Sequence, residues 1–273
     1  MKKIFLFSMI WLIANITFAQ KSIRLAYQLE QGQHFEMLIK NNQTISMSMA
    51  GQTMVLQQQV EMTQTADVTE VSADKQQMAM DLTYTAIRLK QNAMGMETVW
   101  DSKKPDDNSN PIGKQIGEAL GKSLNKPIHI VIDPVGKPMS LDKGSENSQK
   151  VNLSGLETGM MVVFPEHELQ LNESWQTKIQ PDPSSDFTIE STYVLESISG
   201  KKATISFNGT ISGTKMMGEK ALVSGTITGK SEVNLQTGWT LSSSVNQKLE
   251  MEMEQQGMRI PMQLSSFIEL TTK

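Results

Sequence analysis

Apolar and polar residues alternate over most of this 273-residue chain, and this period of two restricts its fold more than any other feature. Successive side chains of a strand point to opposite faces of a sheet, so the alternation predicts strands with one buried face. Near Ile87 the parity changes, which predicts a bulge. The predicted strands cover residues 23–29, 35–49, 54–68, 78–89, 94–100, 187–195, 203–211, 223–235, 239–253 and 258–270.

The middle of the chain departs from this period. Residues 112–124 place Ile or Leu at every fourth position, which predicts a short amphipathic helix. Asn110 and Pro111 suit its cap and first helical position, and Pro127 lies beyond its end. Residues 127–141 predict a strand, a Pro-Gly turn and a second strand, and residues 145–163 allow another short helix.

The expected fold class is therefore mainly β: long antiparallel meandering strands that form a curved sheet or half-barrel, with one or two short central helices. Strands of about 15 residues exceed the usual length, and sheet twist curls such strands rather than leaving a flat slab. We divide the chain into a signal peptide (1–19), an N-terminal β-meander half (20–101), a central helix, loop and hairpin region (102–170) and a C-terminal β-meander half (171–273). The last three parts are expected to form one composite domain.

Residues 1–19 have the features of a secretory signal peptide. Lys2 and Lys3 precede the apolar run IFLFSMIWLIANI, and Thr17 and Ala19 place small residues before a cleavage site between Ala19 and Gln20. The apolar run is shorter than the ~20 residues of a spanning helix, which favours cleavage over anchoring. We expect an exported, soluble protein of the periplasm or the extracellular space, with no membrane span after signal removal.

Charge and cysteine content exclude several classes of function. Removal of residues 1–19 takes away two of the 25 basic residues and none of the 29 acidic ones, so the formal net charge becomes −6. Without a basic block, nucleic acid is not an expected partner. The chain has no cysteine, which excludes disulfides, thiolate metal sites, a cysteine nucleophile and the lipidated cysteine of a bacterial lipoprotein.

No catalytic or cofactor motif stands out. The chain lacks G-x-S-x-G, a glycine-rich phosphate loop and a carboxylate-ligand loop, and its three histidines, His34, His129 and His167, are scattered. Asp81 and Asp133 lie in β patterns and are expected to face water. The stretch FPEHELQLNESW, residues 164–175, is interpreted as a structural corner before a strand. We therefore expect a protein that is not an enzyme and has no cofactor and no metal centre.

Methionine is the one residue type with a suggestive pattern, since 20 methionines accompany only eight phenylalanines. Methionine adapts to irregular or changing contact surfaces, so a methionine-lined strand face is either core filler or a binding face for a hydrophobic or amphiphilic small molecule or an envelope protein. A copper-binding role is the alternative, because thioethers select Cu(I). The candidate ligand-binding residues are Met47, Met49, Met54, Met62, Met251, Met253, Met258 and Met262.

The two methionine-rich stretches also resemble each other. Residues 42–54, NQTISMSMAGQTM, align without a gap on residues 246–258, NQKLEMEMEQQGM, and Phe35 then falls opposite Trp239. The shared parity and turn length predict two equivalent hairpins, one in each half, as a duplicated element rather than a repeat array.

Several segments together resemble a known family. These are LAYQLEQGQHFEM (25–37) with the methionine-rich hairpin after it, DPVGKPMSL (133–141), the FP…ESW corner and the hairpin that begins at QTGW (236–239). They resemble the DUF6263-like family, exported bacterial proteins common among Bacteroidota that are known only as a domain of unknown function. Many relatives have glycine where this chain has Asn172-Glu173. The resemblance implies location and fold, and no active site. In outline the predicted strands are also similar to periplasmic lipoprotein-carrier half-barrels, by fold-level analogy only.

Overall fold

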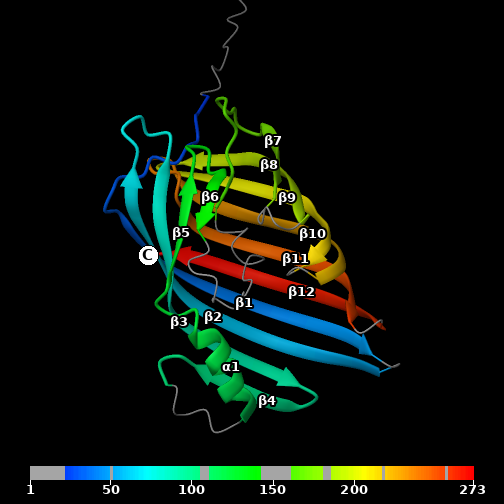
Figure 1. The fold of residues 1–273 in the computed structure, drawn as a ribbon. Helices are drawn as coiled ribbons and strands as arrows, with labels where there is room; N and C mark the ends of the chain where they lie inside the picture. Colours follow the sequence, from blue (N-terminus) through cyan, green and yellow to red (C-terminus); the bar gives the residue numbers. More distant parts are fainter. Residues whose placement is uncertain are drawn as a thin grey trace, which may run out of the picture.

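The structure is a computed structural model that describes residues 22–49, 52–104, 111–142, 161–180, 186–216, 219–255 and 258–273. Within these ranges the chain forms twelve strands and one helix (Figure 1). They are β1 (His34–Met49), β2 (Gln52–Val71), β3 (Met78–Ala93), β4 (Met96–Asp101), α1 (Pro111–Gly121), β5 (Pro127–Ile132), β6 (Pro138–Asp142), β7 (Ser174–Ile179), β8 (Thr188–Ser199), β9 (Lys202–Met216), β10 (Glu219–Asn234), β11 (Thr240–Gln255) and β12 (Met258–Thr272).

All twelve strands belong to one antiparallel sheet. Its order is β6-β5-β3-β2-β1-β12-β11-β10-β9-β8-β7, and β4 pairs with β3 beside this path. Most neighbours are also neighbours in sequence, as in a meander. The pairing of β1 with β12 instead joins the N-terminal and C-terminal halves of the chain at the centre of the sheet. The sheet does not close, and β6 and β7 lie at the two ends of this strand order.

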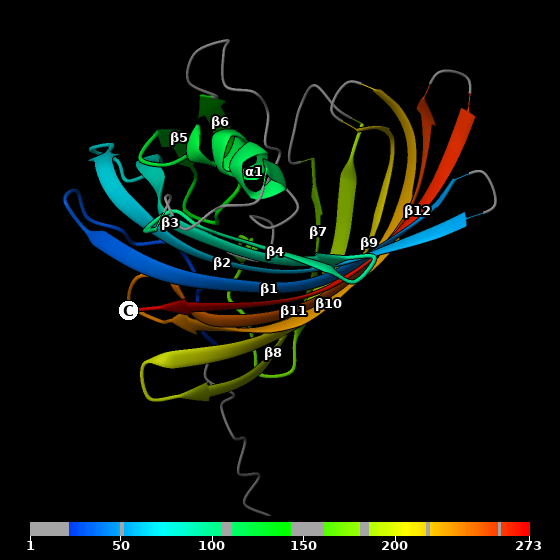
Figure 2. The ribbon, with the colours of Figure 1, turned by 90° about the horizontal axis from the view of Figure 1, so that it is seen from below.

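The sheet is strongly curved, and the core lies on its concave side. Figure 2 shows the long strands bending into a trough, with α1, β5 and β6 over the hollow. The inward residues predicted from the alternation are the ones that the structure buries, among them Met37, Ile39, Met62, Ile205 and Ile268. The fold class is therefore confirmed as a mainly β, half-barrel-like curved sheet with a short helix.

Small residues on the concave side allow large neighbours to lie flat against the backbone. A Cβ atom at Gly229 would overlap the ring of Phe207 and stand 2.5 Å from the carbonyl oxygen of Ser244. At Gly225 a Cβ atom would stand 2.6 Å from the side chain of Leu249. Both glycines lie on β10, and the close approach explains why no side chain is present there.

Residues 23–29 do not form the predicted strand. Leu25, Tyr27 and Leu29 are buried, as the alternation requires, but in the described chain this segment has only an isolated bridge from Ile23 to Leu169. Its backbone instead bonds to loops: the Tyr27 amide donates to Pro134 and the Gln28 amide donates to Thr237. Alternation of apolar and polar residues indicates only that one side of an extended segment is buried. Such a segment shows the same pattern whether or not a neighbouring strand pairs with it.

Other local predictions hold. The predicted change of parity near Ile87 is a bulge, because the pairing with β2 skips Thr85. The predicted helix is α1, which begins at Pro111; Gly117 packs against the indole of Trp100 on β4. Residues 127–142 form the predicted hairpin of β5 and β6, with Gly136 at φ 85° in its turn. Asn172 has φ 65° in the FP…ESW corner, a left-handed conformation that asparagine adopts more readily than most residues.

The two similar hairpins are β1–β2 and β11–β12, and they lie side by side in the sheet. Phe35 and Trp239, at matching positions, stack with ring centroids 4.2 Å apart. The two predicted hairpins are confirmed with the predicted parity, but the alignment does not superimpose their turns. In the first hairpin Met49 pairs with Gln52, whereas in the second Gln255 pairs with Met258, so the second turn comes two residues later than the alignment places it. A shift of two residues keeps every side chain on its face.

Some predictions fall on residues outside the described ranges: the cleavage site at Ala19 and Gln20, the cap at Asn110, and most of the second helix allowed over 145–163. Among the described residues, no helix is both long enough and apolar enough to cross a membrane.

Candidate ligand-binding face

The sheet register brings four of the candidate methionines together. Met47 on β1 lies directly opposite Met54 on β2 and also opposite Met262 on β12, and Met262 lies opposite Met251 on β11. Directly opposed residues have Cβ atoms about 4.5–5.5 Å apart. These four residues, here called the methionine row, therefore form a continuous band of thioether side chains across four strands of the concave face.

The methionine row becomes more exposed toward the β1–β2 hairpin. Met251 is buried, Met47 and Met262 are half-buried, and Met54 is 37% exposed. Along β2, at right angles to the row, burial increases from the exposed hairpin end to the fully buried Ala66. The row therefore lies at the accessible end of the concave face.

The remaining candidate methionines are elsewhere. Met62 is 1% exposed and lies in the core, eight residues from Met54, or about 27 Å along β2. Met49, Met253 and Met258 occupy strand positions near the hairpin turns, where Met49 pairs with Gln52, Met253 with Ile260 and Met258 with Gln255. Their side chains are outside what the structure describes.

Two further rows follow the methionine row toward the buried end. The first is apolar and consists of Leu56, Ile45, Leu264 and Leu249. The next, here called the amide row, crosses five strands and consists of Gln91, Gln58, Gln43, Ser266 and Gln247. Ser266 and Gln247 are buried, and the other three are half-buried. A polar band thus lies between two apolar regions of the same face.

The concave face of the four central strands carries no charged residue. The inward positions of β1, β2, β11 and β12 hold only apolar, amide and hydroxyl residues along their paired lengths. Ion pairs occupy the opposite face, for example Arg259 with Glu252 at 3.3 Å. Burial also raises the pKa of Tyr193 on β8, which keeps its phenol neutral.

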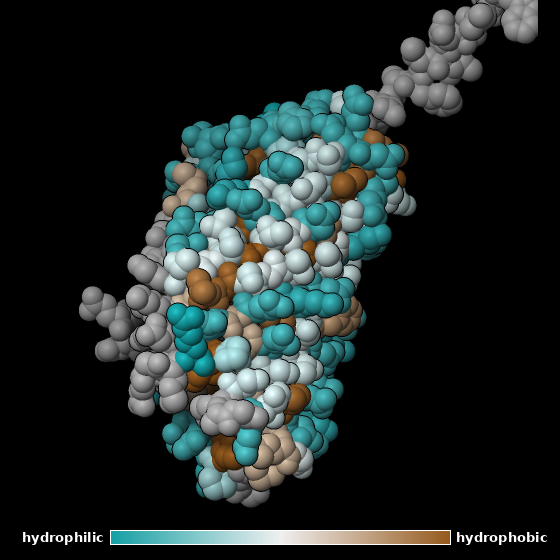
Figure 3. Space-filling model, turned by 90° about the vertical axis from the view of Figure 1, so that its right-hand side faces the viewer, coloured by the Kyte–Doolittle hydropathy of each residue, from teal (hydrophilic) through white to brown (hydrophobic). Residues whose placement is uncertain are grey.

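The outer surface contrasts with this face. Figure 3, which shows the molecule from the right-hand side of Figure 1, has small hydrophobic areas scattered among hydrophilic ones. Exposed apolar residues of the outward positions, such as Val55, Leu222 and Phe267, come from three separate strands. Isolated apolar residues of this kind are normal on a protein surface.

A pocket of about 660 Å³ lies between the two edges of the sheet, and sequence reasoning missed it. Its walls include β7, the start of β6 and residues 163–167. Trp175 donates its Nε1 proton to the carbonyl of Val163 at 2.8 Å, and the amide of Phe164 donates to Val135 at 2.8 Å. The predicted structural corner, residues 164–175, therefore connects the β5–β6 turn to β7 through these two hydrogen bonds. No local pattern signals a pocket that depends on how two distant edges approach.

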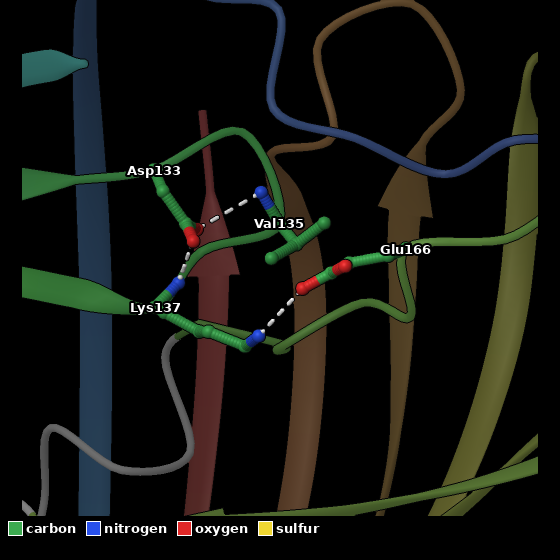
Figure 4. Close-up of polar contacts among 4 residues, drawn as sticks. All are labelled: Asp133, Val135, Lys137 and Glu166. Atoms are coloured by element: carbon green, nitrogen blue, oxygen red, sulfur yellow. Dashed lines mark hydrogen bonds and ion pairs between the residues drawn. The ribbon is translucent and has the colours of Figure 1, made fainter. Parts of the chain in front are cut away.

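Asp133 shapes the turn beside this pocket. Its carboxylate accepts hydrogen bonds from the backbone amides of Val135 at 3.0 Å and Lys137 at 2.7 Å, and the Lys137 ammonium reaches Glu166 at 3.0 Å (Figure 4). Lys137 lowers the pKa of the Glu166 carboxyl by hydrogen bonding and by its charge. Because both side chains of this ion pair are exposed, the pair contributes little to the stability of the fold.

The three histidines lie apart, each beside one carboxylate. His34 pairs with Asp67 at 2.6 Å, His129 with Asp81 at 2.8 Å, and His167 with Glu173 at 3.0 Å. In the described part of the chain no three His, Cys, Asp or Glu residues converge as metal ligands would.

The fold and this face define a protein built on one open, curved antiparallel sheet whose four central strands present no charged residue to the concave side in their described pairings. Residues 145–240 match the model of DUF6263, a family of unknown function, which confirms the family resemblance over that part of the chain. No curated protein sequence matches the chain.

Three solved structures show distant similarity to the chain. An outer membrane channel from Pseudomonas putida F1 has 6% identity and a TM-score of 0.27, over 90% of this chain and 97% of the channel. The translocator domain of the autotransporter NalP from Neisseria meningitidis has 7% identity and a TM-score of 0.25, with 89% of each chain covered. OccK11 (OpdR) from Pseudomonas aeruginosa has 7% identity and a TM-score of 0.19, over 91% of this chain and all of that one, at 100%. At these values the matches say nothing about function.

Proposed function

We propose that this protein is a non-enzymatic, exported envelope protein that binds a hydrophobic ligand, or an apolar segment of a protein partner, on its concave face at the methionine row. The observation that carries the proposal is the register that aligns Met54, Met47, Met262 and Met251 across four strands, with exposure rising toward Met54. Unbranched, polarizable side chains at the accessible end of an apolar face suit a ligand whose contacts vary.

Export to the periplasm or the extracellular space is part of the same proposal. It is supported by the signal-like residues 1–19. A binding role rather than a catalytic one is supported by the lack of catalytic motifs in the sequence.

A titration with the uncharged dye Nile red tests the proposal. We expect Met47→Gln and Met262→Gln to weaken dye binding about tenfold, because each replaces an apolar contact by an amide. The matched control is Met94→Gln, since Met94 is 76% exposed in the β3–β4 turn, away from the concave face. Denaturant melts of the same variants establish that each one is folded. Unchanged dye binding in both folded row variants, or no dye uptake by the native protein, would count against the proposal.

Cu(I) binding is the second candidate, favoured by one observation. Met47 lies opposite two other methionines, so three thioethers lie in adjacent cross-strand positions. Met47→Leu separates the candidates because it keeps the apolar volume and removes the sulfur. Copper retained after desalting by the native protein but not by the variant supports a metal role. Dye binding that survives the substitution, with no copper retained by the native protein, supports the hydrophobic ligand.

A further inference from the structure

The amide row belongs to a directional hydrogen-bond chain. Asn41 donates from Nδ2 to Oε1 of Gln43 at 3.3 Å, Gln43 donates from Nε2 to Oε1 of Gln58, and Gln58 donates from Nε2 to Oε1 of Gln91 at 3.1 Å. Amide dipoles that are linked in one direction polarise one another. This series of hydrogen bonds therefore strengthens the acceptor oxygen of Asn41 at one end and the donor amide of Gln91 at the other.

At the buried end this chain stops at an oxygen without a partner. Asn41 is 3% exposed, and its Oδ1 atom has no hydrogen-bond partner within the structure. Asn41 lies on the concave face, in the register row next to the amide row and between Val60 and Ile268. A buried acceptor without a partner costs free energy, and a donor from outside the protein, either water or a ligand, would remove that cost. The amide of Gln64, also on the inward face of β2, is unpaired at both polar atoms but lies deeper, at 0% exposure.

The charge distribution defines what kind of group that donor belongs to. An ionised head group on the concave face would lose its hydration, and among the described strands the inward positions of β1, β2, β11 and β12 offer it no counter-ion. A hydroxyl or an amide N–H donates a hydrogen bond without carrying charge. Both match the unpaired oxygen of Asn41.

We propose that the occupant of the concave face is an uncharged amphiphile, with a hydroxyl or amide head at the amide row and Asn41 and a hydrocarbon chain along the two apolar rows. This inference rests on the proposed function and names its ligand class. From the amide row to the methionine row the distance is four residues along each strand, about 14 Å, which is the length of face available to the hydrocarbon.

Three ligands with the same acyl chain test the proposal: glycerol monolaurate, with neutral hydroxyl donors; methyl laurate, which is neutral without a donor; and laurate, which is ionised at pH 8. Each is titrated below its micelle concentration as a competitor of Nile red on the full chain. We expect glycerol monolaurate to bind about tenfold more tightly than methyl laurate and more tightly still than laurate.

Two variants and one control locate the head group. Asn41→Leu and Gln58→Leu are expected to reduce the binding of glycerol monolaurate to the level of methyl laurate while dye binding persists. Gln59→Leu is the matched control, because Gln59 neighbours Gln58 but points to the outer face and is exposed. If Asn41→Leu fails to fold, the affinity of Gln58→Leu for glycerol monolaurate, compared with that of Gln59→Leu, answers the same question.

The possible failures are distinguishable. Equal affinity for the three ligands, tightest binding of laurate, or a monolaurate preference that survives both variants would overturn the uncharged-amphiphile inference while the hydrophobic binding face stands. No competition by any ligand, together with no Nile red uptake, would overturn both proposals.

Discussion

At the scale of single residues, the concave face depends on positions where no side chain fits. At Gly229 an added Cβ atom would meet both a neighbouring ring and a backbone carbonyl oxygen, and the carbonyl cannot move without disturbing the pairing of β10 with β11. We expect Gly229→Ala to lower the free energy of unfolding by about 1–3 kcal/mol, the usual cost of overpacking. Urea denaturation measures it. Gly121→Ala at the end of α1, where a Cβ atom meets nothing within 4 Å, is the control and should not lower stability, since alanine favours a helix over glycine.

The buried hydroxyl of Tyr27 makes the stability of the fold depend on pH. Its hydroxyl donates to the carbonyl of Val162 at 3.1 Å, and its ring packs on Phe164. Burial raises the pKa of this phenol far above its ordinary value. The folded chain therefore keeps a proton that the unfolded chain loses above about pH 10, so stability falls as pH rises beyond that point. We expect Tyr27→Phe to cost about 1 kcal/mol at pH 7. The variant should also show a shallower alkaline loss; an identical slope would contradict the assignment.

At the scale of elements, the sequence predicts the strands better than their partners. Alternation located β1, β2 and β8–β12 because each has one buried face, and α1 followed from its fourfold spacing. The same rule failed for residues 23–29, where burial without a neighbouring strand gives the same pattern. The alternation also could not fix the position of the second hairpin turn, which lies two residues later than predicted. A shift of two residues keeps every inward side chain inward, so the pattern does not detect it.

The methionine row shows why the site itself was only partly predictable. Methionines on the correct faces of β1, β2, β11 and β12 follow from the sequence, but Met47 meets Met262 only because β1 pairs with β12 in one register. These residues are far apart in sequence, and no local turn fixes that pairing. The amide row was missed for the same reason, since Gln43, Ser266 and Gln247 become neighbours only across strand pairs from both halves. Exposure along the face was likewise invisible in the alternation.

At the scale of the whole molecule, the curved sheet separates charge from its hollow. Outward positions carry the ion pairs, while the inward positions of the central strands carry none. A polar belt within an otherwise apolar hollow adds little to the stability of the fold, since apolar residues of similar size would pack without partners to satisfy. Its presence is better explained by an occupant that is polar at one point and apolar elsewhere.

A single carboxylate moved from one face to the other tests this separation. Gln58→Glu places an acid in the amide row, half-buried and without a basic partner on the concave face, so its folded-state pKa should rise above that of the unfolded chain. A raised carboxyl pKa means that the folded state holds the extra proton, so the variant loses stability as pH rises from about 4 and regains it on acidification. We expect a loss of about 1–3 kcal/mol at pH 7 relative to Gln59→Glu, whose carboxylate faces water on the adjacent residue, and near-equality of the two variants at pH 4. Urea melts of both variants at the two pH values measure the difference. Equal stability at pH 7 would show that the hollow tolerates charge, and the preference for an uncharged ligand would then lose its physical basis.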